Sequence, residues 1–201
     1  MSITDILIND NIALLTLLVF ISASFVAFYS VLYHFILKRN VSIISMAIGA
    51  SVVAVSAYFI ESYSMSVIDS IFLELVFIAP MVEESLKTAG SAYGKKIENG
   101  ISIGLGFALA ENTLYFAAFM TYSMILIISY ILVRGFMDPA FHSFTAGLDS
   151  KAWKGGKSAL WPLASMSIHM GYNFLAVLMG VFALSVPNYG IVGAIVTISL
   201  V

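Results

Sequence analysis

The sequence predicts an all-α integral membrane protein, a polytopic bundle of about seven transmembrane helices. Hydrophobic residues make up 61% of the 201 residues and charged residues only 10%, whereas a soluble domain carries roughly 25% charged residues. Apolar stretches long enough to cross a bilayer, about 20 residues each, also recur along the chain. The chain has no cysteine and a net charge of −2 without a basic run, which excludes a cysteine protease and argues against nucleic acid as a partner.

Six apolar stretches are long enough to cross a bilayer as helices. They cover residues 11–37, 41–60, 68–92, 99–121, 124–150 and 158–185. A seventh stretch, 188–201, would span only about 21 Å as a helix, less than the roughly 30 Å hydrocarbon core, and is expected to form a half-span or part of a longer one. Because no repeat, linker or low-complexity tract divides the chain, residues 1–201 are expected to form one domain.

The basic residues predict the orientation of the bundle. Those outside the spans fall in alternate loops, after the first, third and fifth spans: Lys38, Arg39, Lys95, Lys96, Lys151, Lys154 and Lys157. The positive-inside rule makes that side cytoplasmic and places the N-terminus outside. The opposite loops carry Glu61 and Asp69 and no basic residue. We therefore expect a multi-pass protein of the lipid bilayer, in the plasma membrane of a prokaryote.

Ionisable side chains lie inside the predicted spans, where charge costs several kcal/mol unless it faces the bundle interior with a partner. Four spans carry them: Glu83, Glu84 and Lys87 in the third, Glu111 in the fourth, Arg134, Asp138 and His142 in the fifth, and His169 with Asn173 in the sixth. Spacings of four residues place several of them one turn apart on one helix face. We therefore predict a polar cavity between spans 3 to 6.

These residue types suit hydrolysis by an activated water molecule. A carboxylate in an apolar pocket can act as general base, and adjacent Glu83 and Glu84 point about 100° apart on a helix. One of them can therefore face the cavity while the other binds Lys87 or Arg134. A histidine can orient the water, and a second histidine with an Asn amide can donate to an oxyanion. The set that contains these parts is Glu83, His142, His169 and Asn173.

A metal site is the alternative chemistry, because histidine and carboxylate are common zinc ligands. The candidate ligands are Glu83, Glu111, His142 and His169. The sequence has no HExxH motif of the familiar zinc proteases and no GxSxG elbow for a serine nucleophile. Zinc is therefore possible, but no cofactor is the favoured prediction.

Four motifs occur in the order and spacing of a known family: EESLK, AENTLYF, FHSFTAG and HMGYN, at Glu83, Ala110, Phe141 and His169 respectively. Over about residues 70–175 the chain resembles the PrsW-type intramembrane proteases, which are grouped with the CAAX-prenyl proteases and the Abi proteins. The resemblance implies an endopeptidase with glutamate-based chemistry that cleaves membrane proteins or peptides, with residues 70–175 as its catalytic core.

The resemblance also implies roles for single residues. Glu83 matches the water-activating glutamate with Glu84 as its neighbour, and His142 matches the histidine that assists that base. His169 and Asn173 match the pair on the oxyanion side. Glu111 and Asn112 match an EN pair of the PrsW branch, so Glu111 is expected to line the cavity. The prenyl-protease branch has the motif EExxxR. In this chain Thr88 stands at the position of the arginine, and Lys87 directly precedes it. This difference favours the PrsW branch.

Two other functions use the same residues. A proton- or cation-coupled transporter or channel would use the buried Glu and His cluster as a relay, although the sequence lacks the matched repeats typical of transporters. A catalytically inert membrane scaffold would keep Glu83 and His142 only for structure. Arg134 and Asp138 are in any case expected to form a structural ion pair, four residues apart.

Overall fold

The computed structural model describes residues 3–119, 124–153 and 159–185, and within these residues the chain forms helices and no strand. Four helices are continuous: α1 (Ile3–Phe35), α6 (Ile97–Phe119), α7 (Met124–Asp149) and α8 (Leu160–Ser185). Two further helical rods each contain a π-helical turn. The first of these rods consists of α2 (Ile43–Ile48), η1 (Gly49–Val53) and α3 (Ala54–Val67). The second consists of α4 (Ile71–Leu73), η2 (Glu74–Ile78) and α5 (Ala79–Ser91). A short 3-10 helix, η3 (Ser150–Trp153), follows α7.

The predicted all-α class is confirmed, and each of the six long predicted spans corresponds to one of these rods. The second rod is the informative exception, because it ends at Val67 and not at residue 60. The placement of Glu61 in a loop was therefore wrong, since the helix continues past this acidic residue until the backbone becomes extended at Ile68. The seventh stretch, 188–201, and the lysines Lys154 and Lys157 lie outside the described residues, so the seven-helix count stays a prediction.

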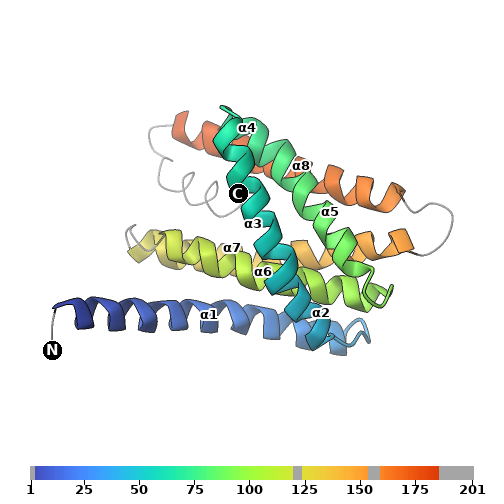
Figure 1. Cartoon of the computed structure of the whole chain (residues 1–201), viewed down its shortest axis with the longest axis horizontal. Coiled ribbons are helices and arrows are strands. Elements are labelled where there is room, and N and C mark those ends of the chain that lie inside the picture. Colours follow the sequence, from blue (N-terminus) through green and yellow to red (C-terminus); the bar gives the residue numbers. More distant parts are fainter. Residues whose placement is uncertain (1–2, 120–123, 154–158, 186–201) are drawn as a thin grey trace.

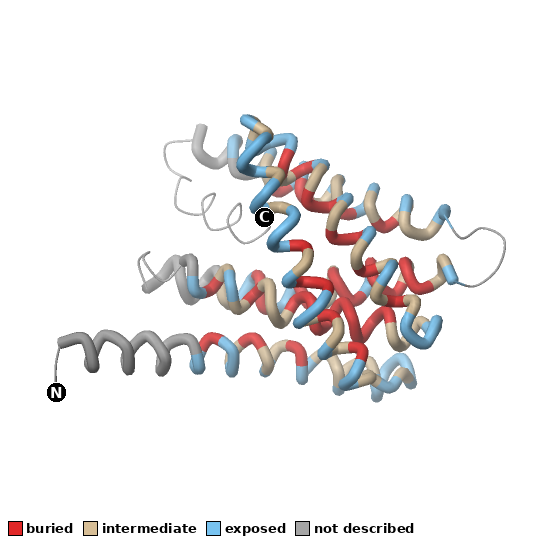
Figure 2. The backbone as a smooth tube through the Cα atoms, viewed as in Figure 1, coloured by how far each residue is buried: buried red, intermediate tan, exposed pale blue. Residues whose placement is uncertain are grey.

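Helix α6 lies at the centre of the arrangement. α1 runs beside α6 and α7, while α5 and α8 lie on the other side and the α2–α3 rod crosses α6 (Figure 1). Every residue of α6 from Ile101 to Ala108 is buried, because small residues in this stretch let neighbouring helices approach closely. Figure 2 shows that buried residues gather where these helices meet, which is also where the buried charges lie.

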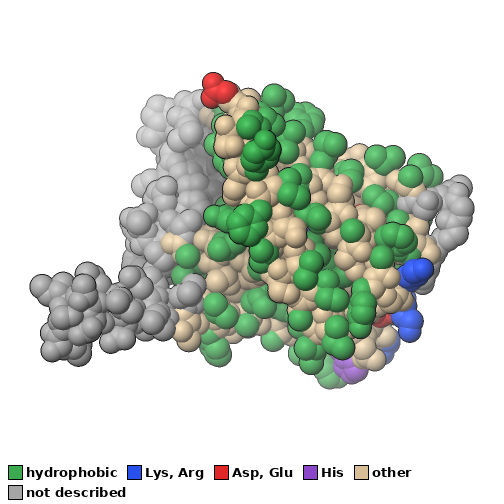
Figure 3. Space-filling model, viewed as in Figure 1, with side chains coloured by type: hydrophobic (Ala, Val, Ile, Leu, Met, Phe, Trp, Pro, Cys, Tyr) green, Lys and Arg blue, Asp and Glu red, His purple; other side chains and the backbone are tan. Residues whose placement is uncertain are grey.

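The outside of the bundle is apolar. Figure 3 shows hydrophobic side chains over the visible face, with Lys and Arg side chains at one end. Large side chains such as Phe20, Phe59 and Ile43 are among the most exposed. Within the described residues, two helices are long and apolar enough to cross a membrane, Thr16–Phe35 and Ile43–Val67. The chain thus exposes apolar side chains and buries charged ones, the reverse of a soluble domain.

Gly104 allows a close approach between α6 and α7. A Cβ atom at this position would overlap the backbone carbonyl of His142, whereas a Cβ at Gly171 of α8 would meet no described atom within 4 Å. We predict that Gly104→Ala lowers the free energy of unfolding by about 1–3 kcal/mol, because backbone cannot yield as a flexible side chain can. Gly171→Ala, the matched control, should leave it unchanged or slightly raised.

Thermal unfolding of the two variants and the wild type in the same detergent measures this difference. Equal melting temperatures for Gly104→Ala and Gly171→Ala would contradict the close packing of α6 against α7.

Candidate active site

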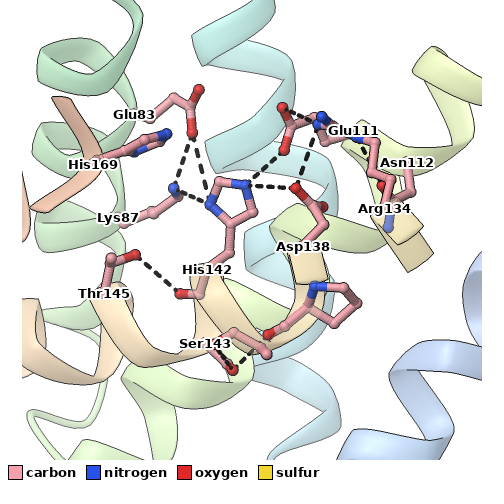
Figure 4. A network of polar contacts seen from close by, with 12 residues as sticks. Glu83, Lys87, Glu111, Asn112, Arg134, Asp138, His142, Ser143, Thr145 and His169 are labelled. Atoms are coloured by element: carbon pink, nitrogen blue, oxygen red, sulfur yellow. Dashed lines mark hydrogen bonds and ion pairs between the residues drawn. The ribbon is translucent and has the colours of Figure 1, made fainter. Parts of the chain in front are cut away.

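Lys87 of α5 is the centre of a buried network of charges (Figure 4). Its ammonium group lies 2.9 Å from Glu83 Oε2, 3.0 Å from Glu84 Oε1 and 2.6 Å from His142 Nδ1. The ring of Phe107 covers the same nitrogen, with 4.1 Å between the nitrogen and the ring centroid. Because an ammonium has three donors, these three acceptors satisfy it without water.

Arg134 of α7 is the second buried cation. Its guanidinium lies 2.6 Å from Glu111 and 3.4 Å from Asp138, and its Nε donates to Asn112 Oδ1 over 3.0 Å. The ring of Tyr115 packs on the guanidinium, 4.0 Å from its carbon to the ring centroid. Arg134 therefore joins α6 to α7, and the predicted pair with Asp138 is confirmed as part of this larger cluster.

His142 connects the two cations. Its Nδ1 lies beside Lys87, and its Nε2 lies 2.7 Å from Glu111 and 3.2 Å from Asp138. Because lysine only donates, Nδ1 accepts and Nε2 carries the proton that is donated to the carboxylates. Glu83 Oε2 is 3.8 Å from Nδ1, beyond hydrogen-bond distance, so Lys87 stands between His142 and Glu83. In this structure His142 is therefore linked to Glu83 through the ammonium group of Lys87.

His169 of α8 is held by the second glutamate. Its Nδ1 lies 2.7 Å from Glu84 Oε1, and Asp149, which accepts from Ser165, lies against the same Glu84. A carboxylate accepts, so Nδ1 donates and Nε2 is the nitrogen left for a ligand. In a neutral ring that nitrogen is an acceptor, and only the doubly protonated ring can donate to an oxyanion.

Asn173 has a partner that the sequence did not indicate. Its Nδ2 donates to the backbone carbonyl of Leu75 over 2.8 Å. This carbonyl lies in the π-helical turn η2. In a π-helix a carbonyl accepts from the N–H group five residues further on. For Leu75 that residue is Pro80, which has no N–H group. Ala79 N–H already binds the carbonyl of Glu74. One amide hydrogen of Asn173 therefore satisfies a partly buried carbonyl that the proline leaves open, and one remains for a ligand.

These side chains surround a pocket of about 130 Å³. Its lining combines polar and charged residues from α3, η2, α5, α6, α7 and α8: Glu61, Glu74, Glu83, Glu111, Arg134, Asp138, His142, His169 and Asn173. Glu84 and Lys87 do not line it and lie behind Glu83. Of the two adjacent glutamates, Glu83 therefore faces the pocket, and Glu84 orients Lys87 and His169.

The structure brings the residues singled out from the sequence together, around or directly behind one pocket. Three further acidic residues belong to the same region and were missed as site residues: Glu61, Glu74 and Asp149. Glu74 is a single acid in an apolar stretch, which was a usable signal, whereas Glu61 and Asp149 stand at or beside the end of a predicted span. Glu74 accepts a hydrogen bond from Ser64 over 2.5 Å, and its other oxygen has no donor among the described residues.

Two groups of side chains have the spacing of metal ligands, Glu83 with Glu111 and His142, and Glu83 with Glu84 and His169. Within each group the possible ligand atoms lie within 4.8 Å of one another. However, Lys87 and Arg134 already bind these same carboxylates and His142. A metal ion bound by either group would compete with these resident cations for the same side chains.

Comparisons with models of protein families, with curated proteins and with solved structures found no match to this chain. The function is therefore inferred from the residues of the site.

Removal of the Lys87 charge should destabilise the whole bundle. We predict that Lys87→Met lowers the free energy of unfolding by about 3–5 kcal/mol, because it leaves Glu83 and Glu84 buried without a cation. Lys95→Met removes the same charge from an exposed loop position and should change it by less than about 0.5 kcal/mol. Detergent melting curves of both variants make the comparison, and equal stability would show that Lys87 does not organise the network.

Proposed function

We propose that the protein is a membrane-embedded endopeptidase in which Glu83 activates a water molecule for attack on a peptide bond. The observation that carries the proposal is the position of Glu83. Its carboxylate lines the pocket and is held from behind by Lys87, while Glu84, which holds the same lysine, is enclosed. A carboxylate fixed on one side and open on the other is what a general base requires.

The proposed reaction uses the side chains in separate roles. Glu83 takes a proton from water as the water oxygen attacks the carbonyl carbon, and the proton then passes to the amide nitrogen as the C–N bond breaks. Lys87 positions the carboxylate and offsets its charge. The tetrahedral oxyanion can be stabilised by the second N–H of Asn173 and by His169 in its doubly protonated form. His142, Glu111, Asp138 and Arg134 hold α6 and α7 in register around these groups.

The membrane setting of the proposal is supported by the apolar exterior and by the two long apolar helices. We propose that all six rods cross the bilayer with the N-terminus outside, in a prokaryotic plasma membrane. The motif order shared with PrsW-type proteases supports the same function by analogy. The proposed substrates are membrane proteins or peptides. Glutamate chemistry without a cofactor is favoured because Lys87 already binds two of the carboxylates that a metal would use, those of Glu83 and Glu84.

A chain of ionisable contacts supports transport as the alternative function. It runs from Asp149 at the end of α7 through Glu84 and Lys87 to Glu83, and Glu74 lies further along the pocket. Such a series could pass protons across the bundle. A transporter would show pH-dependent flux in liposomes, which hydrolysis does not require.

The deciding experiment compares wild type, Glu83→Gln and Glu98→Gln on fluorogenic peptides and single-span proteins in detergent. Glu98 pairs with Arg39 away from the pocket, so Glu98→Gln removes one acidic charge outside the site. We predict that Glu83→Gln lowers kcat by at least about 10²–10⁴-fold, because the general base is lost, while Glu98→Gln cleaves like wild type.

Chelator should leave wild-type cleavage unchanged, and inhibition that added zinc reverses would replace the glutamic mechanism with a metal-dependent one. If Glu83→Gln cleaved at the wild-type rate, Glu83 would not be the base. Proton flux in liposomes by a wild type that cuts no substrate would support transport instead.

A further inference from the structure

A second, larger pocket lies between α3 and α6, with a volume of about 370 Å³. We call it the α3–α6 groove and define it by its main walls, Ala57, Glu61 and Met65 on α3 and Phe107, Glu111 and Leu114 on α6. These positions are spaced three or four residues apart, so each helix lines the groove with one face. Glu83 of α5 also lines it. The groove therefore leads to the proposed catalytic carboxylate.

The way in which the two rods cross opens this groove. A Cβ atom at Gly106 would overlap the backbone carbonyl of Met46, so α2 lies directly against α6 at this point. Beyond the crossing the rod continues as α3, which makes few contacts with α6 and leans away from it (Figure 1). The space between α3 and α6 thus results from the angle at which the two rods cross.

Glu61 is the acidic group of the groove that lacks a counter-ion. Its Oε1 atom is enclosed and has no hydrogen-bond donor in the described part of the chain, and no ion pair involves it there. The two buried cations are engaged elsewhere, Lys87 with Glu83 and Glu84, and Arg134 with Glu111 and Asp138. An enclosed carboxylate oxygen without a donor is costly, so a ligand that brings a donor would be bound there.

We propose that the α3–α6 groove binds an extended apolar segment of a membrane-protein substrate, and that Glu61 selects this segment by binding a Lys or Arg side chain in it. The identity of the ligand as the substrate rests on the proposed protease function. The apolar walls suit the segment's hydrophobic side chains, and the charge of Glu61 is complementary to an ammonium or guanidinium. An acyl chain would fill the walls but offer Glu61 no donor.

Photocrosslinking tests the binding without requiring cleavage. The photoreactive amino acid benzoylphenylalanine replaces Leu114 in the groove. In the matched control it replaces Leu132 on α7, which lies outside the groove. The two positions are similarly exposed, 52% for Leu114 and 50% for Leu132. The probes are synthetic single-span peptides of about 20 apolar residues that carry one Lys, Gln or Glu. Each is tested on the otherwise unchanged protein, on Glu61→Gln and on Asp69→Asn, which removes an exposed acidic charge after α3.

We expect crosslinks from position 114 and not from 132, with the Lys peptide captured at least about tenfold better than the Gln peptide at subsaturating concentration, as a charge-assisted hydrogen bond implies. Glu61→Gln should abolish the preference, Asp69→Asn should keep it, and Glu61→Lys should shift it to the Glu peptide. Equal capture of the Lys and Gln peptides, or equal labelling from 132, would overturn the inference.

The failures of the two proposals can be told apart. If the protein cut none of the peptides but still preferred the Lys peptide through Glu61, the proposed protease function would be contradicted. The groove would then remain a peptide-binding site. Cleavage without capture from position 114 would leave the protease and remove the groove as its binding site. A photoreactive fatty acid that labels position 114 and is not displaced by excess Lys peptide would show a lipid site and contradict the inference.

Discussion

The ammonium group of Lys87 is the contact on which the rest of the structure depends. It binds Glu83, Glu84 and His142 at once, and so ties α5 to α7. Through Glu84 it also fixes His169 and hence α8. A charge buried among apolar helices is tolerated only with such partners, so the folding of these helices and the assembly of the site are a single requirement. Truncation at Lys87 would therefore affect stability and chemistry together.

Much of the fold was predictable from sequence because one constraint dominates it. Apolar stretches of bilayer length became helices, and acidic and basic residues four apart became ion pairs, as at Glu83–Lys87 and Arg134–Asp138. The end of the second span was predicted wrongly, because it was placed at residue 60, directly before the charged Glu61. The helix continues because the α3–α6 groove encloses one oxygen of that carboxylate.

The site was less predictable than the fold because the contacts that assign its roles are long-range. Sequence spacing could not show that Glu83 faces the pocket and Glu84 does not, since that depends on where α7 and α8 pack. Nor could it show that Asn173 compensates for Pro80 at the Leu75 carbonyl, because this contact joins two helices far apart in sequence. The tautomers of His142 and His169 likewise follow only from their partners in space.

Hydrolysis at Glu83 requires that water reaches the buried carboxylates. The chain has no cysteine, so Ala79→Cys creates a single thiol in the pocket lining, one helical turn before Glu83. Ala146→Cys, at a fully buried position away from both pockets, is the control.

The two variants are treated in lipid nanodiscs with a charged, membrane-impermeant methanethiosulfonate reagent. The thiol at position 79 should be modified at least about tenfold faster than the thiol at position 146, because only a thiolate in contact with water reacts. Equally slow modification of both thiols would mean that the pocket is closed to water, and would contradict the proposed hydrolysis.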